Sequence, residues 1–296
     1  MKNPIACGYT IPITLFGIPP SPENHLKSME IVGQAGFRSM ELELYDGLIA
    51  EHQRDLKKMQ AILKRYGMSV PSVMAVEEQM FSTDSSISSR AVKDFDAISD
   101  LVCELESPLI AICGYMPPEI RPQGTELYTG GPPTAVTVSD GFSWPAFWDH
   151  SVQMVAQFAG IAKSKGLTLL IETRANDWFG SVDAIMNLMQ AAEADNLGVI
   201  LDVAHVHAGK EYLALAIRKC GHLIKLVHLS DNDSSQAYHF PPGRGNIDFQ
   251  AVFHNLNLVG FEGTMVIDIS GVDHIVEEAM AARGYFEDLL ARENCF

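Results

Sequence analysis

Basic residues are scarce in this sequence. Its 296 residues include 21 Lys and Arg against 37 Asp and Glu, which gives a formal net charge of −16 at pH 7. No basic cluster interrupts this excess of acidic residues. Because such a surface repels polyanions, we expect no nucleic acid among the partners of this protein.

Long hydrophobic runs and paired cysteines are also missing. The longest apolar stretches, such as Leu169–Ile171 and Leu197–Leu201, have strand length, whereas a membrane-spanning helix needs about 20 residues. We therefore expect no membrane association, and the lack of a signal-peptide pattern favours a cytoplasmic location. The five cysteines are scattered and form no C-x-x-C pair, so reduced structural thiols fit them better than disulfides.

An alternation of short apolar segments with longer helical ones runs through the whole chain. The short segments are rich in Val, Ile and Leu, which is typical of buried parallel strands. No linker divides the sequence. The expected strands are Ala6–Ile13, Ser39–Tyr45, Ser69–Ala75, Leu109–Tyr115, Leu167–Thr173, Leu197–Val203, Ile224–Ser230 and Gly263–Ile269.

The segments between these strands have helical periodicity, with apolar residues three and four positions apart. Eight strands alternating with helices in a chain of this length predict an α/β fold, a single (β/α)₈ TIM barrel formed by residues 1–296. A doubly wound open sheet is the alternative, but no G-x-G-x-x-G follows the first strand. Five glycines are predicted to end helices in the left-handed conformation, namely Gly36, Gly67, Gly166, Gly221 and Gly260.

One connection is unusually long. Residues 116–142, after the fourth strand, are rich in Pro, Gly and Thr. Structureless loops of this length are usually lids or binding loops, and in a barrel the loops after strands form the catalytic face. An insertion that is decorative or contacts another subunit is the alternative interpretation.

The last four strands each end in one charged or imidazole side chain. Glu172, Asp202, His228 and Asp268 are therefore expected at similar height around one rim. Three carboxylates held that close would repel one another, and a cation resolves the conflict. Three oxygens and one nitrogen suit one divalent ion, Mn²⁺ first and otherwise Mg²⁺, Co²⁺ or Zn²⁺. Taken singly, each acid also fits a helix N-cap.

More polar residues surround this rim. His205 is three residues beyond Asp202 and is expected to reach a substrate hydroxyl or carbonyl, or to cap the following turn. Arg174 either pairs with a substrate oxygen or neutralises Asp231. In the polar loop that follows Asp231, Gly243 and Gly245 are expected to let the backbone approach a ligand closely, and Asp248 is a predicted N-cap.

Two further groups of residues are candidates for the pocket wall. Glu41 and Glu43 alternate with leucines, so at least one of these acids is expected to face the barrel interior or its mouth. Trp178, Trp144 and Phe142 either wall the pocket or pack in the core or lid.

At these residues the sequence resembles the sugar phosphate isomerase/epimerase superfamily, the xylose isomerase-like TIM barrels. The resemblance extends over essentially the whole chain. Members include ketose 3-epimerases, hydroxypyruvate isomerases, inosose dehydratases, other sugar lyases and abasic-site endonucleases. The specific elements are Ile171–Thr173, Leu201–His205, Val227–Asn232 and the segment from His239 through Pro-Pro-Gly-Arg-Gly-Asn-Ile-Asp.

The resemblance implies that Glu172, Asp202, His228 and Asp268 bind the metal and that His205 binds a sugar-like substrate. It further implies metal-assisted enolisation, in which one carboxylate removes a proton next to a carbonyl group and a second returns it. Those carboxylates correspond to Glu172 and Asp268. A homo-oligomer is also implied, and a second, non-identical subunit is compatible with the resemblance.

One position departs from the epimerases, which usually have glutamate where this chain has Asp268. Aspartate reaches about 1.5 Å less far, and a misplacement of about 1 Å can cost about 100-fold in rate. A single base with a separate acid, for which His205, His239 and Glu43 are candidates, would favour aldose–ketose isomerisation or β-elimination. A metal-dependent lyase of a keto-sugar, inosose or keto-glycoside is therefore the alternative to an isomerase or epimerase.

The proposed substrate-binding residues are His205, Arg174, His239, Glu43 and Trp178. No phosphate-binding Gly/Lys motif is present, which favours an unphosphorylated polyol, keto acid or glycoside. The endonuclease branch needs histidines on early strands, and none stands at the ends of the second to fourth strands. A non-catalytic barrel subunit is a further alternative, which the intact set of four rim residues disfavours.

Overall fold

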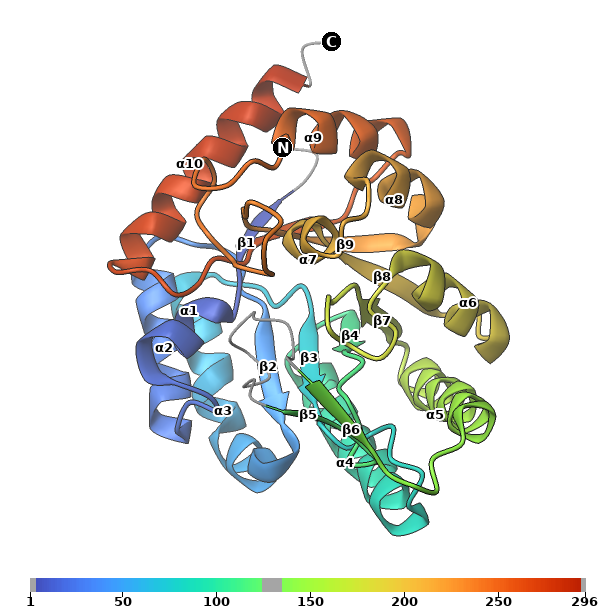
Figure 1. Ribbon diagram of the computed structural model, residues 1–296. Coiled ribbons are helices and arrows are strands. Elements are labelled where there is room, and N and C mark those ends of the chain that lie inside the picture. The colour runs from blue at the N-terminus through green and yellow to red at the C-terminus, as the bar shows by residue number, and fades with distance from the viewer. Residues whose placement is uncertain (1–3, 124–134, 294–296) are drawn as a thin grey trace.

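Eight parallel strands form the centre of the molecule and helices pack around them (Figure 1). The structure is a computed structural model that describes residues 4–123 and 135–293. The central strands are β1 (Ile5–Cys7), β2 (Leu42–Tyr45), β3 (Val73–Val76), β4 (Leu109–Ile112), β7 (Thr168–Glu172), β8 (Leu197–Asp202), β9 (Ile224–Leu229) and β10 (Thr264–Ile267).

The sheet curls until its two edges meet. Its strand order is β1-β10-β9-β8-β7-β4-β3-β2. A parallel bridge between Cys7 and Met40 joins the edges, with Cys7 N–H donating to Ser39 O at 3.0 Å and Glu41 N–H donating to Cys7 O at 2.9 Å. Because closure of a parallel sheet removes both edges, the fold is the predicted TIM barrel rather than the doubly wound sheet.

The helices follow the strands around the outside of the barrel (Figure 1). All five glycines predicted to end helices have positive φ, between 51° and 84°. Gly67 has the left-handed conformation, with φ 60° and ψ 40°, whereas Gly221 departs from it with ψ −126°. The helices are α1 (Thr10–Phe16), α2 (Pro22–Gln34), α3 (Ile49–Tyr66), α4 (Ser85–Glu104), α5 (Trp144–Ser164), α6 (Val182–Ala192), α7 (Val203–Ala208), α8 (Leu213–Cys220), α9 (Phe249–Leu258) and α10 (Ile275–Glu293), with short 3₁₀ turns η1 (Asp46–Leu48) and η2 (Gly221–Leu223).

The first strand is shorter than the sequence predicts. The expected strand Ala6–Ile13 continues only to Cys7, and Gly8 N–H makes a further ladder bond to Ile267 O at 2.8 Å. The chain then turns into α1, which includes residues 10–13 of the expected strand. A short apolar run does not distinguish strand from helix by periodicity, and this prediction was wrong for that reason.

The long connection after β4 is present, but it is not structureless. The antiparallel strands β5 (Ile120–Gln123) and β6 (Ala135–Val138) pair from Ile120–Val138 to Gln123–Ala135. The middle of the connection, residues 124–134, lies outside the described residues. The expectation of an irregular loop over 116–142 is therefore corrected to a connection that contains a two-stranded sheet.

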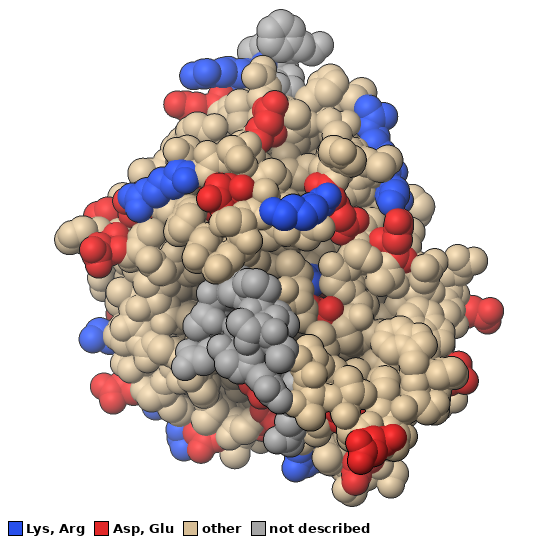
Figure 2. Space-filling view, in the orientation of Figure 1, with Lys and Arg blue, Asp and Glu red and all other residues tan. Residues whose placement is uncertain are grey.

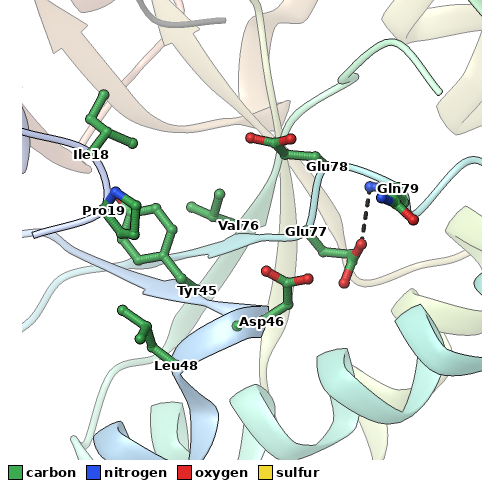
Figure 3. Close-up of a pocket in the computed structure, with 10 residues that line it drawn as sticks. Ile18, Pro19, Tyr45, Asp46, Leu48, Val76, Glu77, Glu78 and Gln79 are labelled. Carbon is green, nitrogen blue, oxygen red and sulfur yellow. Dashed lines mark hydrogen bonds between the residues drawn. The ribbon is translucent and has the colours of Figure 1, made fainter. Parts of the chain in front are cut away.

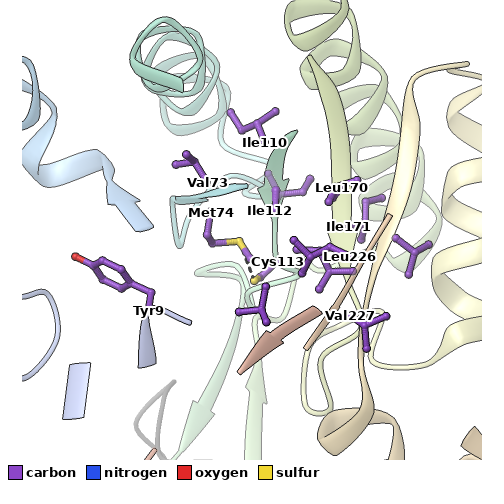
Figure 4. Packing of buried hydrophobic residues seen from close by; sticks show 14 of the residues in the cluster. Tyr9, Val73, Met74, Ile110, Ile112, Cys113, Leu170, Ile171, Leu226 and Val227 are labelled. Carbon is purple, nitrogen blue, oxygen red and sulfur yellow. Dashed lines mark hydrogen bonds between the residues drawn. The ribbon is translucent and has the colours of Figure 1, made fainter. Parts of the chain in front are cut away.

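Hydrophobic side chains of neighbouring strands pack at the centre of the barrel and against the helices. Figure 4 shows this packing around β3, β4, β7 and β9, where the thiol of Cys113 lies 3.5 Å from the sulfur of Met74. Met74 and Cys113 are both buried. Among the described residues, no helix is long and apolar enough to cross a membrane.

Candidate metal centre and active site

Strand register brings four polar side chains to one rim of the barrel. In β7, β8 and β9, Glu172 pairs with Ile200, and Asp202 is directly beside His228. Asp268 follows the last residue of β10. All four residues are at most 6% exposed, so the short apolar strands deliver their side chains into the interior rather than to solvent. The predicted rim is therefore formed as the strand ends indicated.

The carboxylates of the other three residues lie around the ring nitrogen Nδ1 of His228. It lies 2.9 Å from Glu172 Oε1, 3.6 Å from Asp202 Oδ2 and 3.8 Å from Asp268 Oδ2. Glu172, Asp202 and His228 offer one ligand atom each within 4.8 Å of one another. Ligands that share a cation about 2.1 Å away lie at such separations.

Two atoms of the centre have no hydrogen-bond partner in the described part of the chain, although both are buried. They are His228 Nδ1 and Asp202 Oδ2, and His228 Nε2 on the other side of the ring is a third such atom. The other oxygen of Asp202 accepts the N–H of His205 at 2.8 Å and caps α7. A buried carboxylate oxygen without a partner is costly. Both atoms face the same point, and this geometry fits a divalent cation with oxygen and nitrogen ligands.

Glu41 supports His228 from the opposite side of the ring. Its Oε2 lies 2.9 Å from His228 Nε2, and its Oε1 accepts the hydroxyl of Ser72. Such a carboxylate holds the ring proton at Nε2 and leaves Nδ1 for a metal. Sequence reasoning named Glu43 rather than Glu41 as the site residue. Because Glu41 and Glu43 alternate with leucines, the sequence indicated that at least one acid points inward. It did not indicate which of the two contacts His228.

A thiol contacts the second oxygen of Glu172. Cys113 Sγ donates to Glu172 Oε2 at 3.0 Å, and both residues are buried. Sequence reasoning treated all cysteines as structural and missed this contact. The position of Cys113 directly after the fourth strand was the signal that could have identified it.

The electrostatics of the centre favour a positive partner. Burial acts to lower the pKa of His228, but Glu41, Asp202, Asp268 and Glu172 outweigh burial and raise it well above the ordinary value. Burial likewise acts to raise the pKa of Asp268, yet His239 and His228 lower it. The buried carboxylate of Asp268 is thus kept ionised by the positive charge close to it.

His239 and His205 extend the site from Asp268. His239 Nδ1 lies 2.9 Å from Asp268 Oδ2, and its Nε2 lies 3.3 Å from Nε2 of His205. His205 Nδ1 accepts the N–H of Ala175 at 3.2 Å, which assigns the proton of the neutral ring to Nε2. Burial acts to lower the pKa of His239, but the neighbouring carboxylate of Asp268 outweighs burial and raises this pKa to about 9.

Arg174 does not neutralise Asp231. The carboxylate of Asp231 accepts the backbone N–H groups of Gly243, Gly245 and Ile247 at 2.8–3.1 Å. Arg174 instead lies over the ring of Tyr115, 4.9 Å from its centre, and 4.0 Å from Asp177 Oδ1. The N–H groups of Gly243 and Gly245 are directed at Asp231, so it is not through these donors that the loop would bind a ligand.

Glu43 and Trp178 occupy separate parts of the mouth. Glu43 Oε2 accepts the hydroxyl of Tyr45 at 2.5 Å, and burial together with nearby acids raises the pKa of Glu43 to about 8. Trp178 contacts Phe147 and Phe179 with ring centres 4.9 and 4.7 Å apart. Its indole nitrogen is buried without a hydrogen-bond partner among the described residues.

The face of the barrel seen in Figure 2 is hollowed near its middle. An acidic and a basic side chain are visible in the depth of this hollow, whereas the Lys and Arg residues on the surrounding surface are spread singly.

The chain belongs to the xylose isomerase-like TIM barrel family, whose pattern it matches over residues 29–289. It is 22% identical over 280 residues to an uncharacterized protein of Methanocaldococcus jannaschii, covering 90% of this chain and 86% of that protein. It is 26% identical over 139 residues to the L-ribulose 3-epimerase of Mesorhizobium japonicum, where the alignment covers 46% of this chain and 45% of the epimerase.

Solved structures agree with the fold. A D-tagatose 3-epimerase-like protein superimposes with a TM-score of 0.76 at 17% identity, with 98% of each chain covered. At this identity the likeness establishes the common barrel rather than a common reaction. The family and the fold implied by the sequence resemblance are thus confirmed.

Proposed function

We propose that this protein is a metal-dependent sugar isomerase or epimerase that removes a proton from the carbon next to a carbonyl group. The observation that carries the proposal is the convergence of Glu172, Asp202 and His228 on one buried point. Asp268 lies nearby, 3.8 Å from His228. Similarity to an L-ribulose 3-epimerase supports a sugar-like substrate.

A divalent cation would be held by Glu172, Asp202, His228 and Asp268, with Mn²⁺ as the first candidate because the donor set mixes carboxylate oxygens with one imidazole. When bound, it would supply Lewis acidity toward the negative charge that develops on a substrate oxygen. The first test of this set is the metal content of the wild type and of the double variant Glu172→Gln, Asp268→Asn.

Glu172 is the proposed base. Its carboxylate is fixed between His228 and the thiol of Cys113, and a fixed orientation is what proton transfer to a carboxylate requires. As the C–H bond breaks, its electron pair moves toward the neighbouring carbonyl carbon, and the carbonyl oxygen takes up the charge. Asp268 or a protonated histidine then determines where a proton returns.

The imidazoles of His205 and His239 are the proposed donors to substrate oxygens. Both are largely buried and face one another at 3.3 Å. Arg174, Glu43 and Trp178 are proposed to contact the rest of the substrate. Return of the proton to the opposite face of the same carbon gives an epimer, and return to the former carbonyl carbon gives an isomer.

A lyase is the second candidate, and the contact between His239 and Asp268 favours it. Asp268 Oδ2 lies 2.9 Å from His239 Nδ1, so this carboxylate is engaged by an imidazole. A base at Glu172 together with an imidazolium acid matches β-elimination, in which the removed proton remains on the carboxylate and a hydroxyl leaves as water after protonation.

We expect the Mn²⁺-loaded protein to exchange a C–H proton of at least one ketose for deuterium in D₂O, measured by NMR. Glu172→Gln should reduce this exchange by about 10²–10⁴-fold, the usual contribution of a general base. Glu104→Gln, at the exposed end of α4, is the matched control and should leave the rate unchanged.

The product separates the two candidates. An epimerase or isomerase gives a sugar of the same mass, whereas a lyase releases water and gives an unsaturated or rearranged carbonyl compound. Binding of metal without deuterium exchange or water loss on ketoses, inososes and keto-glycosides would reject both and leave a non-catalytic barrel.

A further inference from the structure

A second group of carboxylates lies at the opposite side of the barrel from β8 and β9, outside the site described above. Asp46 begins η1 after β2, Glu77 follows the last residue of β3, and Asp94 is in the middle of α4. One oxygen from each residue lies within 4.8 Å of the others. Three segments that are far apart in sequence therefore place acidic oxygens around one point.

Glu77 is directed into this group and is incompletely satisfied. It is only 2% exposed. Its Oε1 accepts the N–H of Gln79 at 3.0 Å, whereas Oε2 is buried and meets no N–H donor among the described residues, because its polar neighbour is the carboxyl group of Asp46. Figure 3 shows the carboxylates of Glu77 and Asp46 facing one another beside a pocket. A buried carboxylate oxygen that faces another carboxylate requires a proton or a cation.

In the part of the chain that the structure describes, no Lys or Arg side chain forms an ion pair with Glu77. Arg90, whose side chain is 56% exposed, lies 4.0 Å from Asp94 and donates to Gln79 Oε1 at 3.2 Å. Burial is the main reason that the pKa of Glu77 rises to about 8, and the neighbouring Asp46 raises it further. Burial is also the largest cause that raises the pKa values of Glu78 and Asp94, and the charge of Asp46 is the second. Asp46 therefore acts on its acidic neighbours as a negative charge, whereas Arg90 and Lys93 act on Asp94 in the opposite direction.

We propose that Asp46, Glu77 and Asp94 bind a second divalent cation, one that prefers oxygen ligands, Ca²⁺ or Mg²⁺. The donor atoms are all carboxylate oxygens, which suit these hard ions. The centre at His228 has an imidazole and suits Mn²⁺, Co²⁺ or Zn²⁺ as well. The pocket that Asp46 and Glu77 line has a volume of about 320 Å³, which leaves room for water molecules to complete the coordination.

Such a cation would join η1, the loop after β3 and α4. The same loop carries Ser82 and Thr83, whose hydroxyls donate to Glu119 at 2.9 and 2.8 Å. Glu119 directly precedes β5. Ion binding at Glu77 would therefore stabilise the segment from which the two-stranded β5–β6 sheet starts.

The test is calorimetric titration of Ca²⁺, and separately of Mg²⁺, into metal-free wild type and into Asp202→Asn, which removes a ligand of the His228 centre. We expect Asp202→Asn to retain one ion per chain. Adding Glu77→Gln or Asp94→Asn should weaken this binding at least tenfold. Adding Glu104→Gln should not, because Glu104 is exposed at the end of α4 and lies outside the group.

Thermal unfolding provides a second measurement that does not depend on the Asp202 variant. Ca²⁺ or Mg²⁺ should raise the Tm of Mn²⁺-loaded wild type and of Glu104→Gln but not that of Glu77→Gln. Without added ion, Glu77→Gln should unfold no lower than wild type, because the amide oxygen of Gln can accept the N–H of Gln79 and brings no charge into the group. No uptake of either ion by Asp202→Asn, or equal uptake after Glu77→Gln, would show that the carboxylates share only a proton.

Discussion

Glu41 acts on the candidate metal centre through His228. It lies 2.9 Å from Nε2, on the side of the ring away from the other carboxylates, and is itself held by Ser72. A carboxylate in this position orients the ring and increases the basicity of the opposite nitrogen. The affinity of the centre for a metal should therefore depend on a residue that does not touch the metal.

Glu41→Gln should weaken Mn²⁺ binding about 10–100-fold, the usual effect of losing such a partner. Competition with a chelator of known affinity measures the change. Glu104→Gln serves as the exposed control, and the Tm of both variants without metal shows whether the barrel is intact. Unchanged affinity in a folded Glu41→Gln protein would mean that His228 is oriented by its packing alone.

At the scale of elements, the connection between β9 and α9 is organised by Asp231. Three backbone N–H groups donate to its buried carboxylate, and Phe240 exchanges two backbone hydrogen bonds with it. His239 is adjacent to Phe240, so the same network sets the position of this candidate catalytic imidazole. Gly245 is essential here because a Cβ atom would lie 2.3 Å from Asn232 O and Asp231 Oδ1.

Gly245→Ala should destabilise the protein by about 1–3 kcal/mol, the usual cost of overpacking, and should reduce the rate of deuterium exchange by displacing His239. Gly284→Ala in α10 is the contrasting control. A Cβ there meets nothing within 4 Å, so alanine should stabilise the helix by about 0.5–1 kcal/mol. Chemical denaturation measures both changes. A neutral Gly245→Ala would mean that the loop adjusts without strain.

At the scale of the whole molecule, stability should depend on histidines buried without charge. His25 and His52 are 2% and 3% exposed. Burial lowers the pKa of His25 to about 3 and, against the opposing effect of Glu51 and Asp55, lowers the pKa of His52 to about 4. Since the unfolded chain protonates these rings near pH 6.5, acid favours unfolding through both of them.

His52→Gln isolates this effect. Between pH 6.5 and 4.5 the unfolded wild type binds a proton at His52 that the folded protein does not. Wild type should therefore lose about 1.4 kcal/mol per pH unit relative to the variant. The raised pKa values of Glu43 and Glu77 act in the opposite direction, so the difference between the two proteins is the informative quantity. Equal pH dependence in wild type, His52→Gln and the exposed control His222→Gln would contradict the prediction.

The cytoplasmic location, the homo-oligomer and the second, non-identical subunit were predicted from the sequence. The structure of a single chain does not test them. They stay predictions. Analytical ultracentrifugation of the Mn²⁺-loaded protein addresses the oligomeric state directly.

The sequence by itself determined the barrel and the placement of its rim residues. Eight apolar strand segments, with Gly67, Gly166 and Gly260 closing helices, are local patterns, and local patterns can be read along the chain. The strand-end positions of Glu172, Asp202 and His228 required only that parallel strands end at the same edge. The resemblance to the family could be recognised from the same short sequence segments.

Only the tertiary structure decided which side chains meet across the barrel. Glu41 and His228, Cys113 and Glu172, and Asp231 with the N–H groups of its loop are far apart in sequence or separated by an irregular connection. The end of β1 at Cys7 and the pairing of β5 with β6 were equally hidden, because each depends on the edge that a neighbouring strand offers. Contacts of this kind are set by the closure of the sheet, which no local pattern encodes.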